Sequence, residues 1–183
     1  YKVAEKMKAH GVGASTFSDW WAYKYEVNDA IPHNGALLNY MGIVTAFNSD
    51  DAEMARRLNQ EAAKAVKYGG ASEEDAWKFI TLNPAKLLHI EDKTGSLKKG
   101  KDADLVLWSG HPMSVYSVVE QTYVDGRLYY SLNLDRENRL RNAKERNRLT
   151  QKMLSEKKAG KKTQKIKKEH SFIFHCDDES HSF

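Results

Sequence analysis

An apolar run that ends on two aspartates constrains the fold of this chain more than any other feature. Residues 43–47, IVTAF, are continuously apolar and partly β-branched, which is typical of a strand covered on both faces in a parallel sheet. Asp50 and Asp51 follow within a few residues, and a long helical pattern begins at Ala52. A buried strand that leads directly into a helix predicts a βα unit.

Helical and strand patterns alternate through the first half of the chain. Apolar spacing and glycine or serine boundaries predict helices near residues 1–10, 34–40, 52–68 and 72–82, and strands at 11–17 and 43–47. Such alternation is typical of βα units in a parallel sheet. We therefore expect an α/β fold, with residues 1–90 as its first domain.

The pattern changes after residue 90. Strands are expected at residues 104–108 and 118–124, and Asp125-Gly126 predicts a hairpin turn. We therefore expect residues 91–134 to form a separate small β region.

Residues 135–183 form a basic C-terminal extension, helical at first and then of a composition typical of disorder. Between residues 135 and 169 the chain carries 14 Lys or Arg against 5 Asp or Glu. The positive net charge belongs to this extension, so it does not predict a specific nucleic-acid site. A solvated helix or a contact with a partner explains it better.

The two aspartates have two interpretations. Asp is favoured at helix N-caps, and Asp51 is better placed for the cap because the helical pattern starts at the next residue. Asp50 would then project from the carboxyl end of the strand, where parallel α/β folds place ligands and catalysis. Spacing alone leaves both roles open for Asp50.

Several segments, in this order, resemble the amidohydrolase superfamily. They are IVTAFNSDD at residues 43–51, Asn83-Pro84-Ala85, Gly95-Ser96-Leu97, GKDADLV at 100–106 and VVEQTYVDGRLYY at 118–130. The nearest groups are imidazolonepropionase-like and prolidase-like enzymes. The resemblance implies that residues 1–90 are the last two βα units of a (β/α)8 TIM-type metallohydrolase barrel. It also implies that residues 91–134 belong to a composite β-sandwich.

The same resemblance implies hydrolysis of a carbon–nitrogen bond by metal-activated water, in a cyclic amide, an amidine or an Xaa-Pro dipeptide. Asp50 would be both a metal ligand and the catalytic acid/base, with Ser49 and Asp51 supporting it. The implied cofactor is a divalent metal, zinc, as one or two ions. Their other ligands lie outside this chain, which contains no His-x-His pair. The chain alone is expected to be inactive.

An aromatic loop is the candidate wall of the substrate site. Residues 18–25, SDWWAYKY, would follow the seventh barrel strand on its catalytic face, and aromatic walls with a few polar groups are typical of small-molecule sites. The candidate substrate-binding residues are Asp19, which can bind a substrate amine, and Trp20, Trp21, Tyr23 and His33. The alternative is that the tryptophans cover the barrel rim or a subunit contact.

The expected partners are a small-molecule substrate and a missing N-terminal part of the same protein. Tyr1 lies within an expected helix, so upstream sequence is expected and the sequence says nothing about export. No apolar run is long enough for a membrane span. Association with further copies of the protein is left open. Two rival interpretations are a non-catalytic scaffold of the same fold and an adaptor that binds an anionic partner through residues 135–169.

Overall fold

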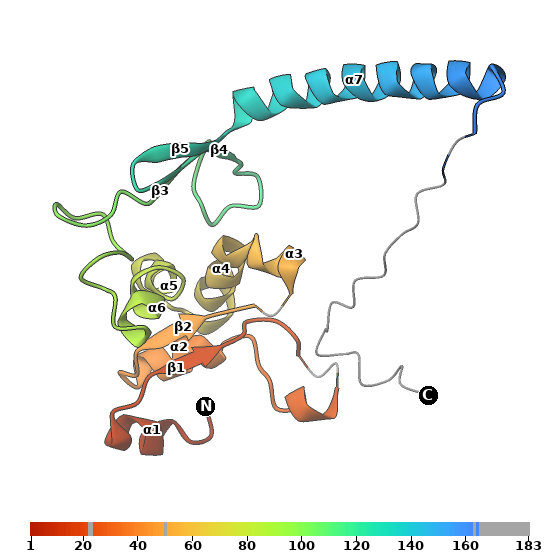
Figure 1. The fold of residues 1–183 in the computed structure, drawn as a ribbon. Helices are drawn as coiled ribbons and strands as arrows, with labels where there is room; N and C mark the ends of the chain where they lie inside the picture. Colours follow the sequence, from red (N-terminus) through yellow and green to blue (C-terminus); the bar gives the residue numbers. More distant parts are fainter. Residues whose placement is uncertain (22–23, 50, 163, 165–183) are drawn as a thin grey trace. The chain divides into compact units, whose positions relative to one another are not determined.

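The computed structural model describes residues 1–21, 24–49, 51–162 and 164. It divides into two compact units, Tyr1–Ser131 and Leu132–Phe183. Figure 1 shows the elements of both units, coloured along the sequence. The expected boundary at residue 90 within the first unit stays a prediction.

The first unit begins with a parallel pair of strands. β1 (Ala14–Thr16) follows α1 (Ala4–His10), and β2 (Thr45–Phe47) follows η1 (Tyr25–Val27) and α2 (Asn34–Tyr40). Ala14 lies opposite Thr45 and Thr16 opposite Phe47. The predicted strands and their parallel arrangement are confirmed, within an α/β fold.

The helical pattern after β2 does not form the single predicted helix. It forms α3 (Ala52–Ala55) and α4 (Leu58–Gly69), separated at Arg57, whose φ of −126° and ψ of 27° leave the helical region. Only α4 has buried residues, so packing aligns α4 and leaves the single turn of α3 free to diverge. As predicted, α4 ends at a glycine, Gly70, in the left-handed conformation.

Two further helices follow α4. α5 (Glu73–Lys78) starts at the predicted cap, where the Ser72 hydroxyl accepts the Asp75 N–H at 3.1 Å. α6 (Leu82–Leu87) was not predicted, and it carries Pro84 in its first turn, where the missing N–H costs no helical hydrogen bond.

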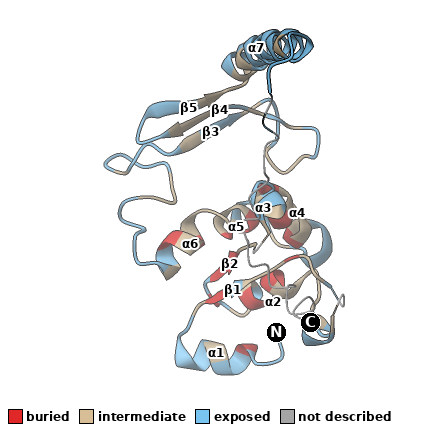
Figure 2. Cartoon of the chain, turned by 45° about the vertical axis from the view of Figure 1, so that its right-hand side comes forward, coloured by how far each residue is buried: buried red, intermediate tan, exposed pale blue. Residues whose placement is uncertain are grey.

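The core of this unit lies between the strands and the helices. One cluster of buried residues contains Phe47, Ala62, Ala65, Ala76 and Phe79, and the two phenylalanine rings meet at 5.1 Å between centroids. A second cluster contains Ala4, Ala14, Leu38 and Ile43. Figure 2 shows buried residues on β1 and β2 and on the helices around them.

A three-stranded antiparallel sheet completes the first unit. β3 (Leu105–Trp108), β4 (Val119–Val124) and β5 (Arg127–Ser131) pair in that order, with the predicted turn at Asp125-Gly126. No residue of these strands is buried. Apolar side chains are therefore exposed on this sheet, among them Val106, Leu107, Leu128 and Tyr129.

The loop between β3 and β4 packs against α4 and α5. Asn59 Nδ2 donates to the Pro112 carbonyl at 2.6 Å, and Met113 packs against the cluster around Phe47. His111 Nε2 lies 3.2 Å from the Glu73 carboxylate. α4 is thereby joined to the β region that follows it.

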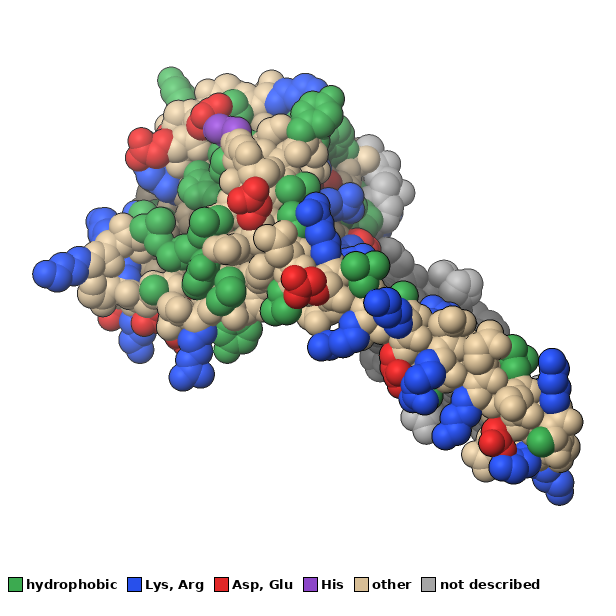
Figure 3. Space-filling model, turned by 90° about the horizontal axis from the view of Figure 1, so that it is seen from above, with side chains coloured by type: hydrophobic (Ala, Val, Ile, Leu, Met, Phe, Trp, Pro, Cys, Tyr) green, Lys and Arg blue, Asp and Glu red, His purple; other side chains and the backbone are tan. Residues whose placement is uncertain are grey.

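The second unit begins with one long helix, α7 (Leu132–Lys158), which has no buried residue. Lys and Arg side chains run along it with acidic side chains between them, as Figure 3 shows. Ion pairs join Arg139 to Asp135 at 2.7 Å and Arg148 to Glu145 at 2.6 Å. The predicted helix is confirmed, whereas most of the segment predicted to be disordered lies outside the described residues. No helix in the described ranges has the length and apolar character needed to cross a membrane.

Candidate functional site

Segments far apart in the sequence meet at β2. Asn83 Nδ2 donates to the Thr45 carbonyl at 2.7 Å, and the Phe47 N–H donates to the Phe79 carbonyl at 2.8 Å. Thr45 is fully buried and Asn83 nearly so. Asn83, the first residue of Asn-Pro-Ala, therefore satisfies a buried backbone group of the strand.

The Asn-Pro-Ala and Gly-Ser-Leu segments touch each other. Gly95 has φ +81°, and a Cβ added there would lie 2.7 Å from Ala85 Cβ and 3.0 Å from the Thr81 carbonyl oxygen. Only glycine combines this conformation with so close an approach. The contact fixes the chain after α6 directly on the helix.

Polar residues of the GKDADLV segment bind the loop that precedes it and the β4–β5 turn. Lys101 Nζ donates to Ser96 Oγ at 2.8 Å and to the Thr94 carbonyl at 3.2 Å. The Asp104 carboxylate accepts from Thr94 Oγ1 at 3.1 Å and from the Asp125 N–H at 3.0 Å. These polar residues hold loops together, so their role in this structure is architectural.

The carboxyl ends of β1 and β2 lie side by side. The Asn48 N–H donates to the Thr16 carbonyl at 3.1 Å, and the Ser15 hydroxyl donates to Asn48 Oδ1 at 3.0 Å. Because the strands are parallel and in register, residues 17–21 and residues 48, 49 and 51 lie beyond the same edge of the sheet. This edge is the candidate site, and we call it the strand-end site.

Asp51 caps α3 in the way the sequence predicts. Its Oδ1 accepts the N–H groups of Glu53 at 2.8 Å and Met54 at 2.9 Å, and its own N–H donates to Ser49 Oγ at 3.3 Å. Asp50 lies outside the described residues. Its roles as metal ligand and acid/base, and the support expected from Ser49 and Asp51, stay predictions.

A buried glutamate that sequence analysis missed anchors the loop after β1. Glu61, in α4, is 6% exposed and accepts a hydrogen bond from the buried Ser18 hydroxyl. Lys64 Nζ donates to both Glu61 oxygens, at 2.9 and 2.8 Å. A buried carboxylate needs such partners. The available signal was an acidic residue within the apolar stripe of α4.

Asp19 lies next to this network, but one of its two carboxyl oxygens lacks such a partner among the described residues. Its Oδ2 is buried and finds no hydrogen-bond donor within the described part of the chain. Burial raises the pKa of Asp19 most, and the negative charge of Glu61 raises it next. The positive charge of Lys64 lowers this pKa, and the negative charge of Asp51 raises it further. The strand-end site therefore has an excess of negative charge.

Replacing Asp19 with asparagine is expected to stabilise the full-length protein at neutral pH. The folded-state pKa of Asp19 is raised, so the fold favours the protonated carboxyl, and this favourable contribution is lost as pH rises through the raised value. Urea unfolding should show the smallest gain for Asp19→Asn at about pH 4, near the pKa of an unfolded aspartate, and a larger gain toward pH 8.

The matched control for this prediction is Asp29→Asn. Asp29 is exposed and pairs with Lys2 at the surface, so the control should show no gain in stability that grows with pH. A difference between Asp19→Asn and the parent that is the same at both pH values would contradict the prediction.

The described aromatic residues of the loop pack partly on α4. The Trp21 indole N–H donates to the Ser18 carbonyl at 2.9 Å, and its ring meets Tyr68 edge-on at 5.8 Å. Trp20 has φ +64°, which is unusual for a bulky residue and turns the chain sharply. Tyr23 lies outside the described residues.

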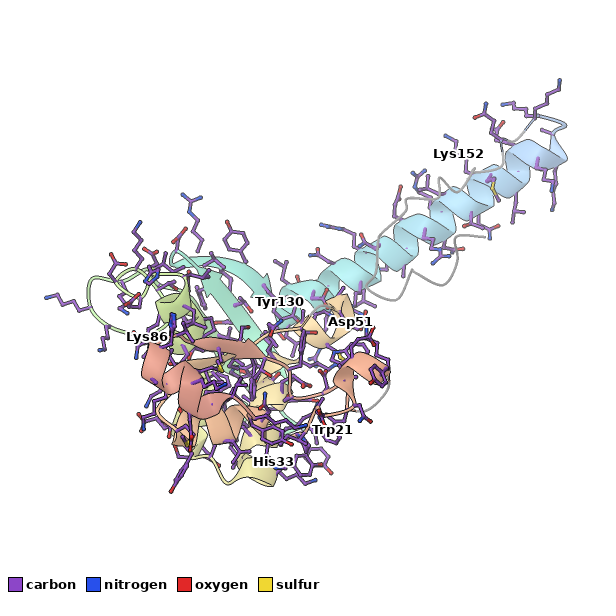
Figure 4. The ribbon with its side chains drawn as sticks, turned by 90° about the horizontal axis from the view of Figure 1, so that it is seen from below. Trp21, His33, Asp51, Lys86, Tyr130 and Lys152 are labelled. Carbon is purple, nitrogen blue, oxygen red and sulfur yellow. The ribbon has the colours of Figure 1, made fainter. Side chains whose placement is uncertain are left out.

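His33 lies at the start of α2, where it is the N-cap residue. A Cβ added to Gly69 would lie 3.2 Å from His33 Cβ, so His33 is beside the end of α4. Figure 4 labels it together with Trp21 and Asp51. The structure thus brings Asp19 and Trp21 together around Lys64, and the substrate-binding roles of all these residues stay predictions.

The described carboxylates do not complete a metal site. Within the described ranges, no three His, Cys, Asp or Glu residues are grouped so that they can hold an ion. Asp51 is engaged by the α3 cap, and Glu61 by Lys64 and Ser18. Asp50, the metal ligand expected from the sequence, lies outside the described residues, so the metal site stays a prediction.

Comparison with known proteins agrees with this fold. The model of the amidohydrolase family matches residues 23–129. Amidohydrolase tasK of Hapsidospora irregularis is 32% identical over 111 residues, which cover 60% of this chain and 11% of that protein. Imidazolonepropionase of Picrophilus torridus is 46% identical over 43 residues, which cover 24% of this chain and 11% of that protein.

A solved structure extends the likeness to three dimensions. The crystal structure of an amidohydrolase from Thermotoga maritima MSB8 superimposes with a TM-score of 0.66 and 36% identity, over 72% of this chain and 34% of that one. This chain thus spans only part of each relative. The family model covers more than half of the chain, and the resemblance predicted from the strand end, Asn-Pro-Ala and GKDADLV is confirmed. The chain belongs to the amidohydrolase family.

Proposed function

We propose that this chain is the C-terminal part of a metal-dependent hydrolase that cleaves a carbon–nitrogen bond other than an ordinary peptide bond. Members of this family are hydrolases that act on such bonds, and they are generally metal-dependent. In this proposal β1 and β2 are the last two strands of a (β/α)8 barrel. The observation that supports this proposal is the parallel register of β1 and β2, since the described residues that follow both strands then share one edge of the sheet.

Asp50 is the residue to which we assign the chemistry. When bound, a divalent metal such as zinc lowers the pKa of its water to about 7 and so supplies hydroxide at neutral pH. Asp50 accepts the proton of the attacking water and returns it to the leaving nitrogen. Asp51 supports this role by fixing the start of α3 immediately after Asp50.

The substrate is a cyclic amide, an amidine or an Xaa-Pro dipeptide. The similarity to an imidazolonepropionase supports the first of these. Trp21, which is 41% exposed, offers an apolar wall for a substrate of this size. The loop that carries it is anchored to α4 through Ser18 and Glu61, so that wall has a fixed position.

The test uses the full-length protein that contains this chain. Metal content is measured by elemental analysis, and hydrolysis is measured on imidazolone propionate, a cyclic dipeptide, an amidine and a set of Xaa-Pro dipeptides. We expect about one or two zinc ions per chain and hydrolysis of at least one class, lost on chelation and restored by zinc. A full-length protein that hydrolyses none of them with zinc supplied, and binds no metal, is a scaffold.

A further inference from the structure

The loop after β1 holds Asp19 in a fixed position at the strand-end site. Ser18 is 2% exposed, its hydroxyl donates to Glu61, and its carbonyl accepts the Trp21 indole N–H at 2.9 Å. Asp19 therefore lies between two anchored residues. A carboxyl group held in this way is preorganised for a ligand.

The one lysine whose charge lowers the pKa of Asp19 is already paired with another carboxylate. Lys64 is engaged by both oxygens of Glu61. Asp19 Oδ2 is buried and finds no donor within the described ranges, whereas the residue as a whole is only partly buried. A buried carboxylate oxygen without a donor is unfavourable, and a cationic donor relieves that cost.

The aromatic ring of Trp21 is a second feature of this loop that favours binding of a cation. The residue is 41% exposed, and Lys64 Nζ lies 6.0 Å from the centroid of its ring. Tryptophan faces attract ammonium and guanidinium groups at such distances. The Trp21 ring and the Asp19 carboxylate, whose Oδ2 finds no described donor, thus belong to residues two positions apart in the same loop.

We propose that Asp19, in the same loop as Trp21, binds the ammonium or guanidinium group of a basic side chain of the substrate. The inference rests on the proposed function, since it assigns part of the same strand-end site. The substrate class is then an amide or dipeptide with a basic side chain. A neutral substrate of the same shape binds more weakly, because it leaves the Asp19 carboxylate unpaired.

The same cationic chemistry has a second source, a Lys or Arg from the upstream part of the protein. The two sources give opposite results. A substrate cation leaves the site open to added ligands, whereas an upstream side chain occupies it permanently and makes Asp19 a stabilising residue.

The test is calorimetric titration of the full-length protein with L-arginine and with L-citrulline, which keeps the α-ammonium group and differs only in its uncharged, isosteric side chain. L-lysine and L-norleucine form a second matched pair. We expect each probe with a cationic side chain to bind about tenfold or more tightly than the matched probe with an uncharged side chain. Asp19→Asn should remove that difference, and Asp29→Asn, a surface control, should keep it. Asp19→Ser serves if the asparagine variant does not fold.

The proposal is overturned by equal binding of L-arginine and L-citrulline to the parent, by no binding of either, or by discrimination that survives in Asp19→Asn. Loss of stability in Asp19→Asn without discrimination in the parent assigns the cation to the upstream chain, which also overturns it. Because binding is measured without turnover, charge discrimination in a protein that hydrolyses nothing supports this subsite and rejects the proposed reaction alone.

Discussion

In the full-length protein, Asp50→Asn is expected to lower kcat by about 10²- to 10⁴-fold, the range for loss of a general acid/base. Asparagine keeps the size of aspartate but cannot accept the proton of the attacking water. Steady-state kinetics on whichever substrate the parent hydrolyses gives kcat, and elemental analysis of the same samples gives the metal content.

Asp51→Asn is the matched control, because it is the same change one residue along the chain. Asparagine caps helices as well as aspartate does, so the bonds to the Glu53 and Met54 N–H groups persist, and kcat should fall far less than in Asp50→Asn. If Asp51→Asn loses turnover and Asp50→Asn keeps it, the catalytic role moves to Asp51. If both keep it, the strand-end hypothesis is wrong.

Gly95→Ala is expected to destabilise the full-length protein by about 2–5 kcal/mol. The left-handed backbone costs a non-glycine residue about 1–2 kcal/mol, and overpacking adds about 1–3 kcal/mol. The added methyl group meets Ala85 Cβ at 2.7 Å and the Thr81 carbonyl at 3.0 Å, neither of which is the flexible end of a long side chain. Urea unfolding, with its midpoint and slope, measures the loss.

Gly42→Ala separates the two contributions. Gly42 has nearly the same conformation, φ +82°, but no described heavy atom lies within 4 Å of an added Cβ. Gly42→Ala should therefore lower the free energy of unfolding only by the cost of the left-handed backbone, about 1–2 kcal/mol. Equal losses at both glycines would show that the contact between Gly95 and Ala85 carries no energy.

Local patterns predicted the elements whose signals lie within a few residues of one another. The strand at β2, the caps at Asp51 and Ser72 and the turn at Asp125-Gly126 all belong to this class. The break between α3 and α4 does not, because Arg57 is a good helix former and only tertiary packing separates the two helices. α6 was missed because Pro84 usually ends a helix but here lies in the first turn.

The strand-end site was predicted in part. The sequence placed Asp19, Trp21 and Asp51 beyond strands, and the parallel register brings those strand ends together. It did not identify Glu61, because its partner Ser18 is 43 residues away and no local pattern connects them. Asp50 and Tyr23 lie outside the described residues, so their placement stays a prediction.

α4 connects two loops that share no contact of their own among those described above. Asn59 fixes the loop between β3 and β4 through Pro112, and Glu61, two residues along, fixes the loop that carries Asp19 and Trp21. One helix thus anchors both the β3–β4 loop and the loop after β1. Substitutions at residues 109–117 that shift α4 are therefore expected to shift Asp19 and Trp21 as well, although those positions are distant in sequence from the loop.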